Sequence, residues 1–344
     1  MTTSFLLSID GGQTSTRAMI ASVDGTVLGT GTGNPTVHYL SEGGTEKNRI
    51  SLHGAMLAAL KNAGVDPGDI VAVGMGSTGV DPQGEEVSVI HQIIQEVVPT
   101  RNIQVTTDTY TNLMGASGGE PGIVVIAGGG AIGYGIDKNG RTAISNGFGY
   151  WLGDEGSAFW IGMQAIDLAC RASDRRDEPT ALEQIVLDHF GLKQMRKLPR
   201  IVYRAGFERQ QISFLAPKVA RTAHEGEAAA KSIFDRAAKE LALTAAGILR
   251  QLYSPGDPAD VYPTGGVFSE TGLVRLPFET ELAALWPEAT VRKPRFPPAV
   301  GGLIVAARLF GTKLDQRFLR QLEISLTASG TSTGSADRPQ GSSG

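Results

Sequence analysis

The sequence is poor in several features that mark common classes of protein. Its 344 residues include one cysteine, Cys170, which excludes an internal disulfide framework and a multi-cysteine metal site. No apolar run reaches the ~18 residues of a membrane-spanning helix, and the first residues lack the basic stretch of a signal peptide. Neither sign of charge dominates, since the net charge is −4, so a nucleic-acid-binding surface is not expected. These absences predict a cytoplasmic protein that binds neither nucleic acid nor membrane.

What the sequence does have is length for two domains of ordinary size and enough apolar residues, 41%, to bury a sizeable core. Short apolar runs that end at Asp or Gly alternate with stretches whose apolar residues have helical spacing. The Asp24-Gly25 pair between two such runs is a strong hairpin signal. The first third of the chain is therefore predicted to be α/β, with strands at 5–10, 17–24, 26–33, 70–79 and 103–108 and helices at 50–64 and 88–98.

The opening pattern recurs after residue 120. An apolar run at 122–127 leads into a glycine turn, a second run and an Asn139-Gly140 hairpin turn. The Ile-Asp-Gly-Gly segment at 9–12 corresponds to Ile-Ala-Gly-Gly at 126–129, and in both copies a hairpin glycine follows at a similar spacing. Two unrelated hairpins are the alternative, but the recurrence of both turns favours an internal duplication.

A duplicated glycine turn suggests how the chain could bind phosphate without a lysine. Backbone N–H groups in such turns form anion-binding sites, and two copies facing one cleft could hold one nucleotide. Asp10 beside the first turn would not contact phosphate directly, because an anion beside an anion needs a cation between them, so we expect Mg²⁺ held through water. The hydroxyls of Thr14 and Thr16 could reach phosphate oxygens.

The sequence resembles the BadF/BadG/BcrA/BcrD ATPase family and, within it, the N-acetylglucosamine kinases. The similarity runs over most of residues 4–312, and "GDEGSAFWIG" at 153–162 is its most specific part. It implies an α/β protein with two ribonuclease-H-like domains of the actin/hexokinase type around an interdomain cleft, with ATP and Mg²⁺ as cofactors. The resembling segments are 10–17, 106–116, 126–137, 147–162, 264–268 and 297–307. The expected organisation is an N-terminal domain at 1–118, a C-terminal domain with a helical insertion at 119–298, a returning helix at 299–326 and a disordered tail at 327–344.

Asp108 is the candidate catalytic residue. It ends the predicted strand at 103–108, ahead of a helix from about Tyr110. From the residues alone it could be the N-cap of that helix or a general base that takes the proton of an attacking hydroxyl. The family resemblance implies the second role.

The "GYWLGDEGSAFW" segment offers candidate sugar ligands. Asp154 and Glu155 precede a helical stretch and could cap it, whereas the resemblance implies that Asp154 holds the sugar. Asn34 before Pro35 could be a turn residue or, as in relatives, a sugar contact. The family often has Gly-Trp-Gly where this chain has Gly-Phe-Gly at 147–149, so a stacking indole is absent or displaced. The predicted sugar contacts are Asn34, Asp108, Gly147, Phe148, Asp154 and Glu155.

The second glycine turn departs from the resembling kinases. They usually have Gly-Thr-Gly-Ser where this chain has Gly-Gly-Gly-Ala at 128–131, so two hydroxyls are missing and the preference for an acetyl group is in doubt. A third glycine turn, at Gly265 and Gly266, could cradle the nucleotide or be an ordinary βα loop. The predicted ATP contacts are Gly11, Gly12, Gln13, Thr14, Thr16, Gly128, Gly129, Gly130, Gly265 and Gly266.

Together these observations predict a kinase, expected as a homodimer, that phosphorylates the 6-hydroxyl of an amino sugar. N-acetylglucosamine is the favoured sugar. Glucosamine and N-acetylmuramic acid are the same-class alternatives. An activating ATPase of the same family would hold an iron–sulfur cluster between two subunits, and one cysteine per chain cannot supply four ligands. A sugar-sensing regulator would need a DNA-binding segment ahead of Asp10, where there are few residues. The apolar stripe of the long helices between 165 and 250 is expected to form core or a dimer surface.

Overall fold

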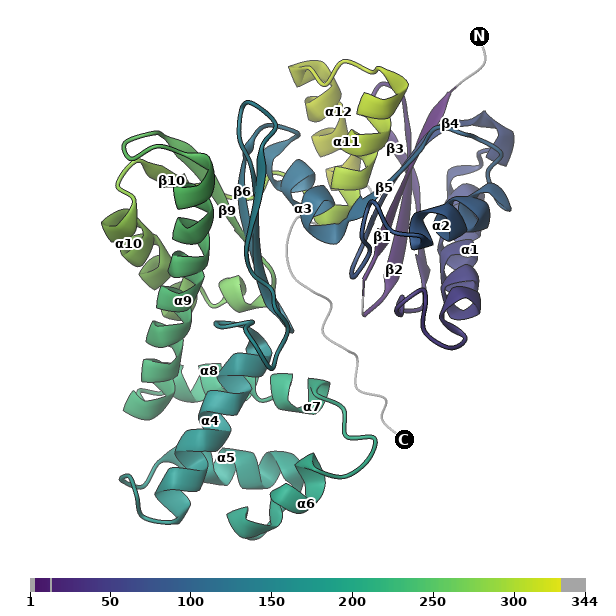
Figure 1. Ribbon diagram of the computed structural model, residues 1–344. Coiled ribbons are helices and arrows are strands. Elements are labelled where there is room, and N and C mark those ends of the chain that lie inside the picture. The colour runs from purple at the N-terminus through teal and green to yellow at the C-terminus, as the bar shows by residue number, and fades with distance from the viewer. Residues whose placement is uncertain (1–3, 13, 329–344) are drawn as a thin grey trace. The chain divides into compact units, whose positions relative to one another are not determined.

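The computed structural model of the protein describes residues 4–12 and 14–328 (Figure 1). The described residues form two compact units: unit 1 contains those up to Pro121 and those from Lys293 on, and unit 2 is Gly122–Arg292. The predicted domain limits after residues 118 and 298 lie near these divisions. Gln13, predicted to contact ATP, and residues 329–344 of the predicted tail lie outside the described residues. No described helix is long and apolar enough to cross a membrane.

Unit 1 is built on a five-stranded mixed sheet in the order β3-β2-β1-β4-β5. The first three strands form an antiparallel meander, with the predicted turn at Asp24-Gly25 between the second and third, and β4 and β5 run parallel to β1. The carboxyl ends of β1, β4 and β5 therefore lie along one edge of the sheet. The strands are β1 (Phe5–Gly11), β2 (Thr16–Ser22), β3 (Val27–Gly33), β4 (Ile70–Ser77) and β5 (Ile103–Thr107).

Helices cover both faces of this sheet (Figure 1). One face is packed by α1, and a Cβ at Gly31 of β3 would overlap the carbonyl oxygen of Ala55, so glycine is needed for this close approach. The other face is packed by α11, the small-residue helix predicted to return to the first domain, where a Cβ at Gly302 would lie 2.8 Å from the carbonyl oxygen of Gly74 in β4. The helices of unit 1 are α1 (Gly44–Ala63), α2 (Glu86–Gln95), α3 (Asp108–Ser117), α11 (Pro298–Phe310), α12 (Gln316–Ala328) and the 3₁₀ turn η1 (Pro67–Asp69). The last two residues of α12 belong to the segment that the sequence assigned to the tail.

Unit 2 repeats the topology of unit 1. Its sheet has the order β10-β9-β6-β7-β8, in which β6, β7 and β8 form an antiparallel meander and β9 and β10 run parallel to β6. Reading from the meander edge, both units have three antiparallel strands followed by two parallel ones, which confirms the duplication. The strands are β6 (Gly122–Ala127), β7 (Ala131–Ile136), β8 (Thr142–Asn146), β9 (Ala259–Thr264) and β10 (Ala289–Val291).

Most of unit 2 outside its sheet is helical. The long helix α9 packs on the sheet, and its apolar stripe, which includes Phe234 and Leu241, is buried in the core of this unit. A group of helices around α4 lies beyond one end of the sheet (Figure 1). The helices are α4 (Ala158–Ser173), α5 (Ala181–Phe190), α6 (Pro199–Val202), α7 (Gln210–Ser213), α8 (Ala216–His224), α9 (Ala228–Leu252) and α10 (Leu276–Leu285), with η2 (Met195–Lys197), η3 (Gly266–Ser269) and η4 (Thr271–Arg275) as short turns.

Candidate functional site

Two carboxylates lie at the carboxyl-end edge of the unit 1 sheet. Asp10 pairs with Gly76 of β4, and Gly76 pairs in turn with Thr106 of β5. Asp108 follows the end of β5, so it lies two strands away from Asp10 along the same edge. Ligands of open α/β sheets bind at this edge, because loops after parallel strands gather there.

The Asp108 carboxylate is held by a hydroxyl that the sequence did not single out. Thr78 Oγ1 donates to Oδ2 of Asp108 at 2.7 Å, and the backbone N–H of Thr78 donates to the carbonyl of Gly11 at 3.0 Å. Thr78 thereby ties the carboxylate to the first glycine turn. The capping alternative for Asp108 is wrong: Thr107 is the N-cap, with its hydroxyl accepting from the N–H of Tyr110 at 3.2 Å, and the helix begins at Asp108 itself.

Asp10 is affected by the second carboxylate. Burial and, next, the charge of Asp108 raise the pKa of Asp10 to about 6, while the nearby Arg17 opposes the shift. Two carboxylates that repel each other in a desolvated place favour a cation between or beside them. No group of three or more His, Cys, Asp or Glu side chains able to hold a metal occurs among the described residues. The two carboxylates, Asp10 and Asp108, are ligands of the kind that Mg²⁺ uses in proteins, where water and phosphate complete its shell.

The first glycine turn is tightly packed. A Cβ at Gly11 would lie 2.9 Å from Ser77 Oγ and 3.1 Å from Thr36 Cγ2, so glycine is required by space. Gly12 accepts from the N–H of Thr36 at 3.0 Å, which anchors the turn to the loop after β3. Thr14 is exposed, as a phosphate contact requires.

Thr16 corrects one of the predicted ATP contacts. Its side chain is 0% exposed, and its hydroxyl lies 2.7 Å from the carbonyl oxygen of Asn34, to which it donates, and 2.6 Å from Ser51 Oγ. A hydroxyl used in this way cannot bind phosphate. Instead, Thr16 and Ser51 of α1 fix the backbone of the loop that carries Asn34. Asn34 itself is exposed.

The second glycine turn is more open than the first. Cβ atoms at Gly128 and Gly129 would meet nothing within 4 Å, whereas one at Gly130 would lie 2.7 Å from Asp154 Oδ2. The carbonyl of Gly128 accepts from the N–H of Ala158, the first residue of α4, at 2.8 Å. The second turn therefore contacts α4 and the Asp154 carboxylate. Cβ atoms at Gly128 and Gly129 would contact no residue that the structure describes.

Asp154 has an unusual backbone and a desolvated side chain. It is 5% exposed and has a left-handed φ of 60°. Burial raises its pKa, although backbone hydrogen bonds from Ala131 and Gly149 and the charge of Arg209 oppose the shift. Neither Asp154 nor its neighbour Glu155 is the helix cap, because Ser157 caps α4 by accepting from the N–H of Trp160 at 3.1 Å.

Asn146 is the functional residue of this loop that sequence reasoning missed. Its Oδ1 accepts from the N–H of both Gly147 and Asp154 at 2.8 Å, and its Nδ2 donates to the carbonyl of Glu155 and to Thr244 Oγ1, each at 3.4 Å. It therefore closes the loop between 147 and 154. Its own φ of 62° is left-handed, and an Asn before a Gly after a predicted strand was the available signal.

The candidate sugar contact Phe148 lies in this loop with 74% of its side chain exposed. Gly147 before it has a φ of 76°, a backbone conformation that glycine adopts without strain. The loop thus presents the aromatic side chain of Phe148 to solvent.

The third glycine turn adjoins the second. Gly265 has a φ of 95°, and a Cβ there would overlap the backbone of Ala127. Gly266 has open space beside it. Thr264 Oγ1 is buried and has no hydrogen-bond partner among the described residues. Within unit 2, then, both predicted nucleotide turns and Asp154 lie together, and within unit 1 so do Asp10, the first turn and Asp108.

Comparisons with known proteins identify the family of the chain. The model of the BadF/BadG/BcrA/BcrD ATPase family matches residues 7–306. The N-acetylmuramic acid/N-acetylglucosamine kinase of Clostridium acetobutylicum is 30% identical over 302 residues, which cover 88% of this chain and 98% of that protein.

Solved structures give the same picture. A protein of Chromobacterium violaceum provisionally assigned as an N-acetylglucosamine kinase is 28% identical, with a TM-score of 0.71 and coverage of 89% of this chain and 100% of that one. A ROK family glucokinase from Streptomyces griseus, solved with glucose and AMPPNP, is 17% identical, with a TM-score of 0.55 over 88% of this chain and 98% of its own. This last likeness concerns the fold, and it confirms the predicted sugar-kinase fold class.

Proposed function

The chain belongs to the BadF/BadG/BcrA/BcrD ATPase family, and we propose that it transfers the γ-phosphoryl group of ATP to the 6-hydroxyl of N-acetylglucosamine. Its homologues make it an ATP-dependent kinase of amino sugars; the particular sugar and hydroxyl are the proposal. The observation that carries the mechanism is the placement of Asp108, held by Thr78 on the same sheet edge as Asp10 and the first glycine turn.

Asp108 acts as the general base. Its carboxylate accepts the proton of the attacking hydroxyl while the hydroxyl oxygen bonds to the γ-phosphorus. The bond between that phosphorus and the bridging oxygen breaks, and ADP leaves. Because Thr78 already donates to Oδ2, the other carboxylate oxygen, Oδ1, is the one that takes the proton.

Asp10 is the residue that would hold Mg²⁺, through water. Bound Mg²⁺ supplies positive charge next to the phosphates and to the two carboxylates. With its pKa at about 6, Asp10 is mostly ionised at neutral pH, so it can orient the water ligands of the ion. The phosphates themselves contact backbone N–H groups of the glycine turns, which need no lysine.

The sugar contacts proposed for this chain come from three segments. Asn34 is presented by the loop that Thr16 and Ser51 fix, and Phe148 and Glu155 belong to the loop that Asn146 closes. Gly147 and Asp154 belong to the same loop, and Asp108 of unit 1 belongs to the third segment. The homodimer and the cytoplasmic location remain predictions.

A coupled ADP-release assay over a panel of sugars tests the proposal. N-acetylglucosamine is expected to give the highest kcat/KM, followed by N-acetylmuramic acid and glucosamine, and phosphorus NMR of the product should place the phosphate on the 6-hydroxyl. The matched control is 6-deoxy-N-acetylglucosamine, which should bind and inhibit but not turn over. A higher kcat/KM for glucosamine or N-acetylmuramic acid would reassign the sugar, and turnover of the 6-deoxy compound would reassign the hydroxyl.

A further inference from the structure

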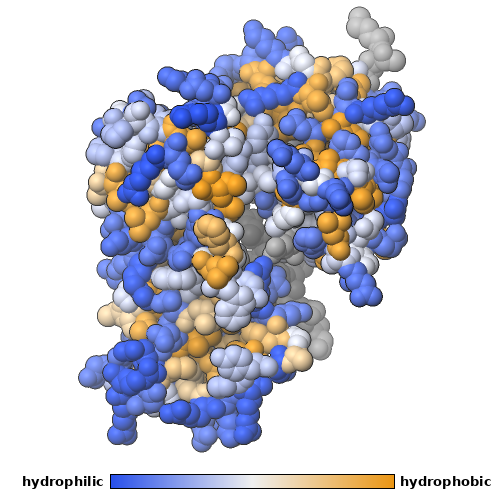
Figure 2. All heavy atoms as spheres, viewed as in Figure 1, coloured by the Kyte–Doolittle hydropathy of each residue, from blue (hydrophilic) through white to orange (hydrophobic). Residues whose placement is uncertain are grey.

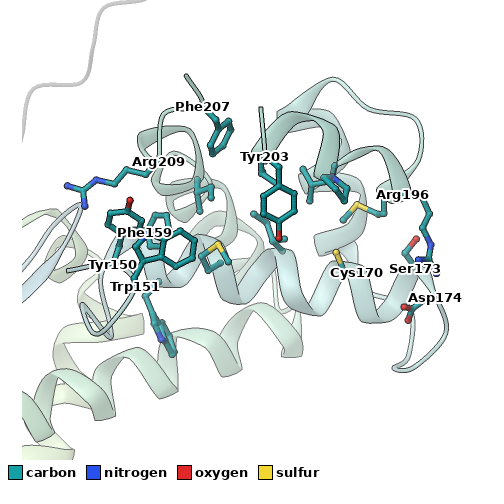
Figure 3. Close-up of a pocket in the computed structure, with 18 of the residues that line it drawn as sticks. Tyr150, Trp151, Phe159, Cys170, Ser173, Asp174, Arg196, Tyr203, Phe207 and Arg209 are labelled. Atoms are coloured by element: carbon teal, nitrogen blue, oxygen red, sulfur yellow. The ribbon is translucent and has the colours of Figure 1, made fainter. Parts of the chain in front are cut away.

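Unit 2 contains a pocket of about 730 Å³ that belongs to none of the glycine turns. Its floor is α4, and its walls come from the loop before α4 and from the segment between Met195 and Ile212 (Figure 3). The volume lies within the ~300–1,000 Å³ of pockets that bind small molecules. Part of its lining belongs to the family-like segment 147–162, and the rest comes from the remainder of α4 and the segment between Met195 and Ile212.

The lining of the pocket is mainly aromatic and apolar. Figure 3 shows Tyr150, Trp151 and Phe159 at one end and Cys170 at the other, with Tyr203 and Phe207 opposite α4. Two of them are open to solvent, since Tyr203 is 84% and Trp151 78% exposed, whereas Phe159 is buried. Figure 2 shows orange residues among blue and pale ones over this helical part of unit 2. An apolar ligand can reach the pocket without unfolding it.

The charged groups at the pocket are mostly cationic. The Arg209 guanidinium lies 4.8 Å from the ring centre of Tyr150 at one end, and Arg196 lies at the other (Figure 3). The single carboxylate in the lining, Asp174, pairs with Arg176 at 2.8 Å. Arg196 is exposed and forms no ion pair with any residue that the structure describes. A cation beside an apolar cavity favours an anionic group on an apolar ligand.

We propose that this pocket binds an organic anion with an aromatic or similarly sized apolar body, as a ligand separate from ATP and the sugar. The body lies between α4 and the side chains of Tyr203 and Phe207, and the anionic group faces Arg196. The apolar area removed from water provides most of the affinity, and the arginine selects the charge.

The pocket shares a loop with the candidate sugar site. Tyr150, Trp151 and Gly153 line the pocket, and the next residue, Asp154, supports the second glycine turn. Burial raises the pKa of Asp154, and the charge of Arg209, from the opposite wall, opposes that shift. A ligand that orders this loop therefore changes how Asp154 is presented. This consequence rests on the proposed function: occupancy shifts the KM for the sugar more than kcat.

Two fluorescent probes with the same ring system test the pocket in the full-length protein. Anilinonaphthalene sulfonate is anionic and phenylnaphthylamine is neutral. Both are expected to bind once per chain and to raise Tm, since a ligand of the native state stabilises it. Arg196→Gln should weaken the anionic probe about fivefold and leave the neutral one within twofold. The matched control is Arg200→Gln, an exposed arginine of the same segment outside the lining, which should change neither.

A filling variant separates this pocket from other apolar surface. Met163 lines the pocket and is 37% exposed, so Met163→Trp can fill the space without disturbing the core. Binding of both probes should be lost while Tm without probe stays the same. Unchanged binding of both probes in Met163→Trp would place them elsewhere and overturn the proposal. Equal affinities of the anionic probe for wild type and Arg196→Gln would overturn its charge preference.

The single cysteine gives a second readout. Cys170 lines the pocket, and burial raises the pKa of its thiol, so alkylation by a small maleimide should be slow and measurable above neutral pH. Saturating anionic probe should slow it at least tenfold. No protection, or a dimer that covers Cys170 and excludes the probes, would refute the site. A sugar KM unaffected by bound probe would refute the coupling between the pocket and the sugar site, but not the pocket itself. Absence of kinase activity would contradict the proposed function and would not change the probe-binding results.

Discussion

The two units share a topology but divide the chemistry. In unit 1 the residue before the glycine turn is Asp10, whose pKa is raised by burial and by the charge of Asp108, and the turn is packed against Ser77 and Thr36. In unit 2 the corresponding residue is Ala127, and the turn has open space in front of it. The sheet topology is repeated, and the two copies differ at this position, where unit 1 has a carboxylate and unit 2 an alanine. Unit 2 keeps a bare backbone surface suited to phosphate.

The largest expected effect comes from changing Asp108, the proposed general base, which lies in unit 1. Asp108→Asn keeps the hydrogen bond from Thr78 but removes proton acceptance, so kcat should fall by about 10³ while sugar affinity persists. Calorimetry for sugar binding beside a turnover assay measures both. Near-normal turnover in Asp108→Asn would remove Asp108 as the base. Asp154→Asn, the matched variant in unit 2, should lower kcat far less.

The second effect concerns the raised pKa of Asp10. A carboxyl whose pKa in the folded protein, about 6, exceeds its value of 3.8 in the unfolded chain destabilises the fold once it ionises. The free energy of unfolding should therefore fall as pH rises from ~4 to ~6, by up to about 3 kcal/mol from this group.

Asp10→Asn should remove that part of the pH dependence, and it should be more stable than wild type at pH 7 without nucleotide. The measurement is denaturant unfolding of both proteins from pH 4 to 7. A constant difference between the two curves over this range would contradict the assignment. The same variant should lose most Mg²⁺-dependent ATP turnover.

The third effect belongs to the loop that only unit 2 possesses. Asn146→Gly tolerates the left-handed φ but loses all four hydrogen bonds of the side chain, so the sugar KM should rise about tenfold with a smaller change in kcat. Asn146→Asp keeps the oxygen that accepts from Gly147 and Asp154, so the sugar KM of this variant should rise less. Equal KM values for wild type and Asn146→Gly would show that the loop holds its shape without this side chain.

The smallest expected effect is the difference in stability between alanine variants of the first and second glycine turns. Gly11→Ala places a Cβ against Ser77 and should cost about 1 kcal/mol of stability. Gly129→Ala places it in open space, so stability should not change, but the KM for ATP should rise if phosphate lies there. Thermal unfolding and ATP kinetics of both variants decide this. Equal loss of stability in the two would contradict the described packing.

The strands, hairpins and duplication were predictable because they depend on local signals. Asp24-Gly25 and Asn139-Gly140 specify turns by backbone preference, and the apolar runs specify buried strands. The prediction for Thr16 was wrong because the contacts of its hydroxyl are not local in sequence. They form only when α1 brings Ser51 next to β2. Thr78 and Asn146 were missed for the same reason: their partners, Asp108 and Asp154, are separated from them in sequence or by a loop whose path no local pattern encodes.

The order in which the segments of unit 1 leave the ribosome follows from its discontinuous path. The five strands of its sheet are complete by Thr107, but α11, which packs on β1 and β4, begins at Pro298. Ser8, buried on that sheet, donates to the carbonyl of Ala299 of this helix at 2.5 Å and lacks that partner until then. At ~5–20 residues per second, synthesis of unit 2 takes roughly 10–30 s. During that interval the face on which α11 packs is covered only in part, by α3, so we expect the nascent sheet to expose apolar surface until α11 has left the ribosome.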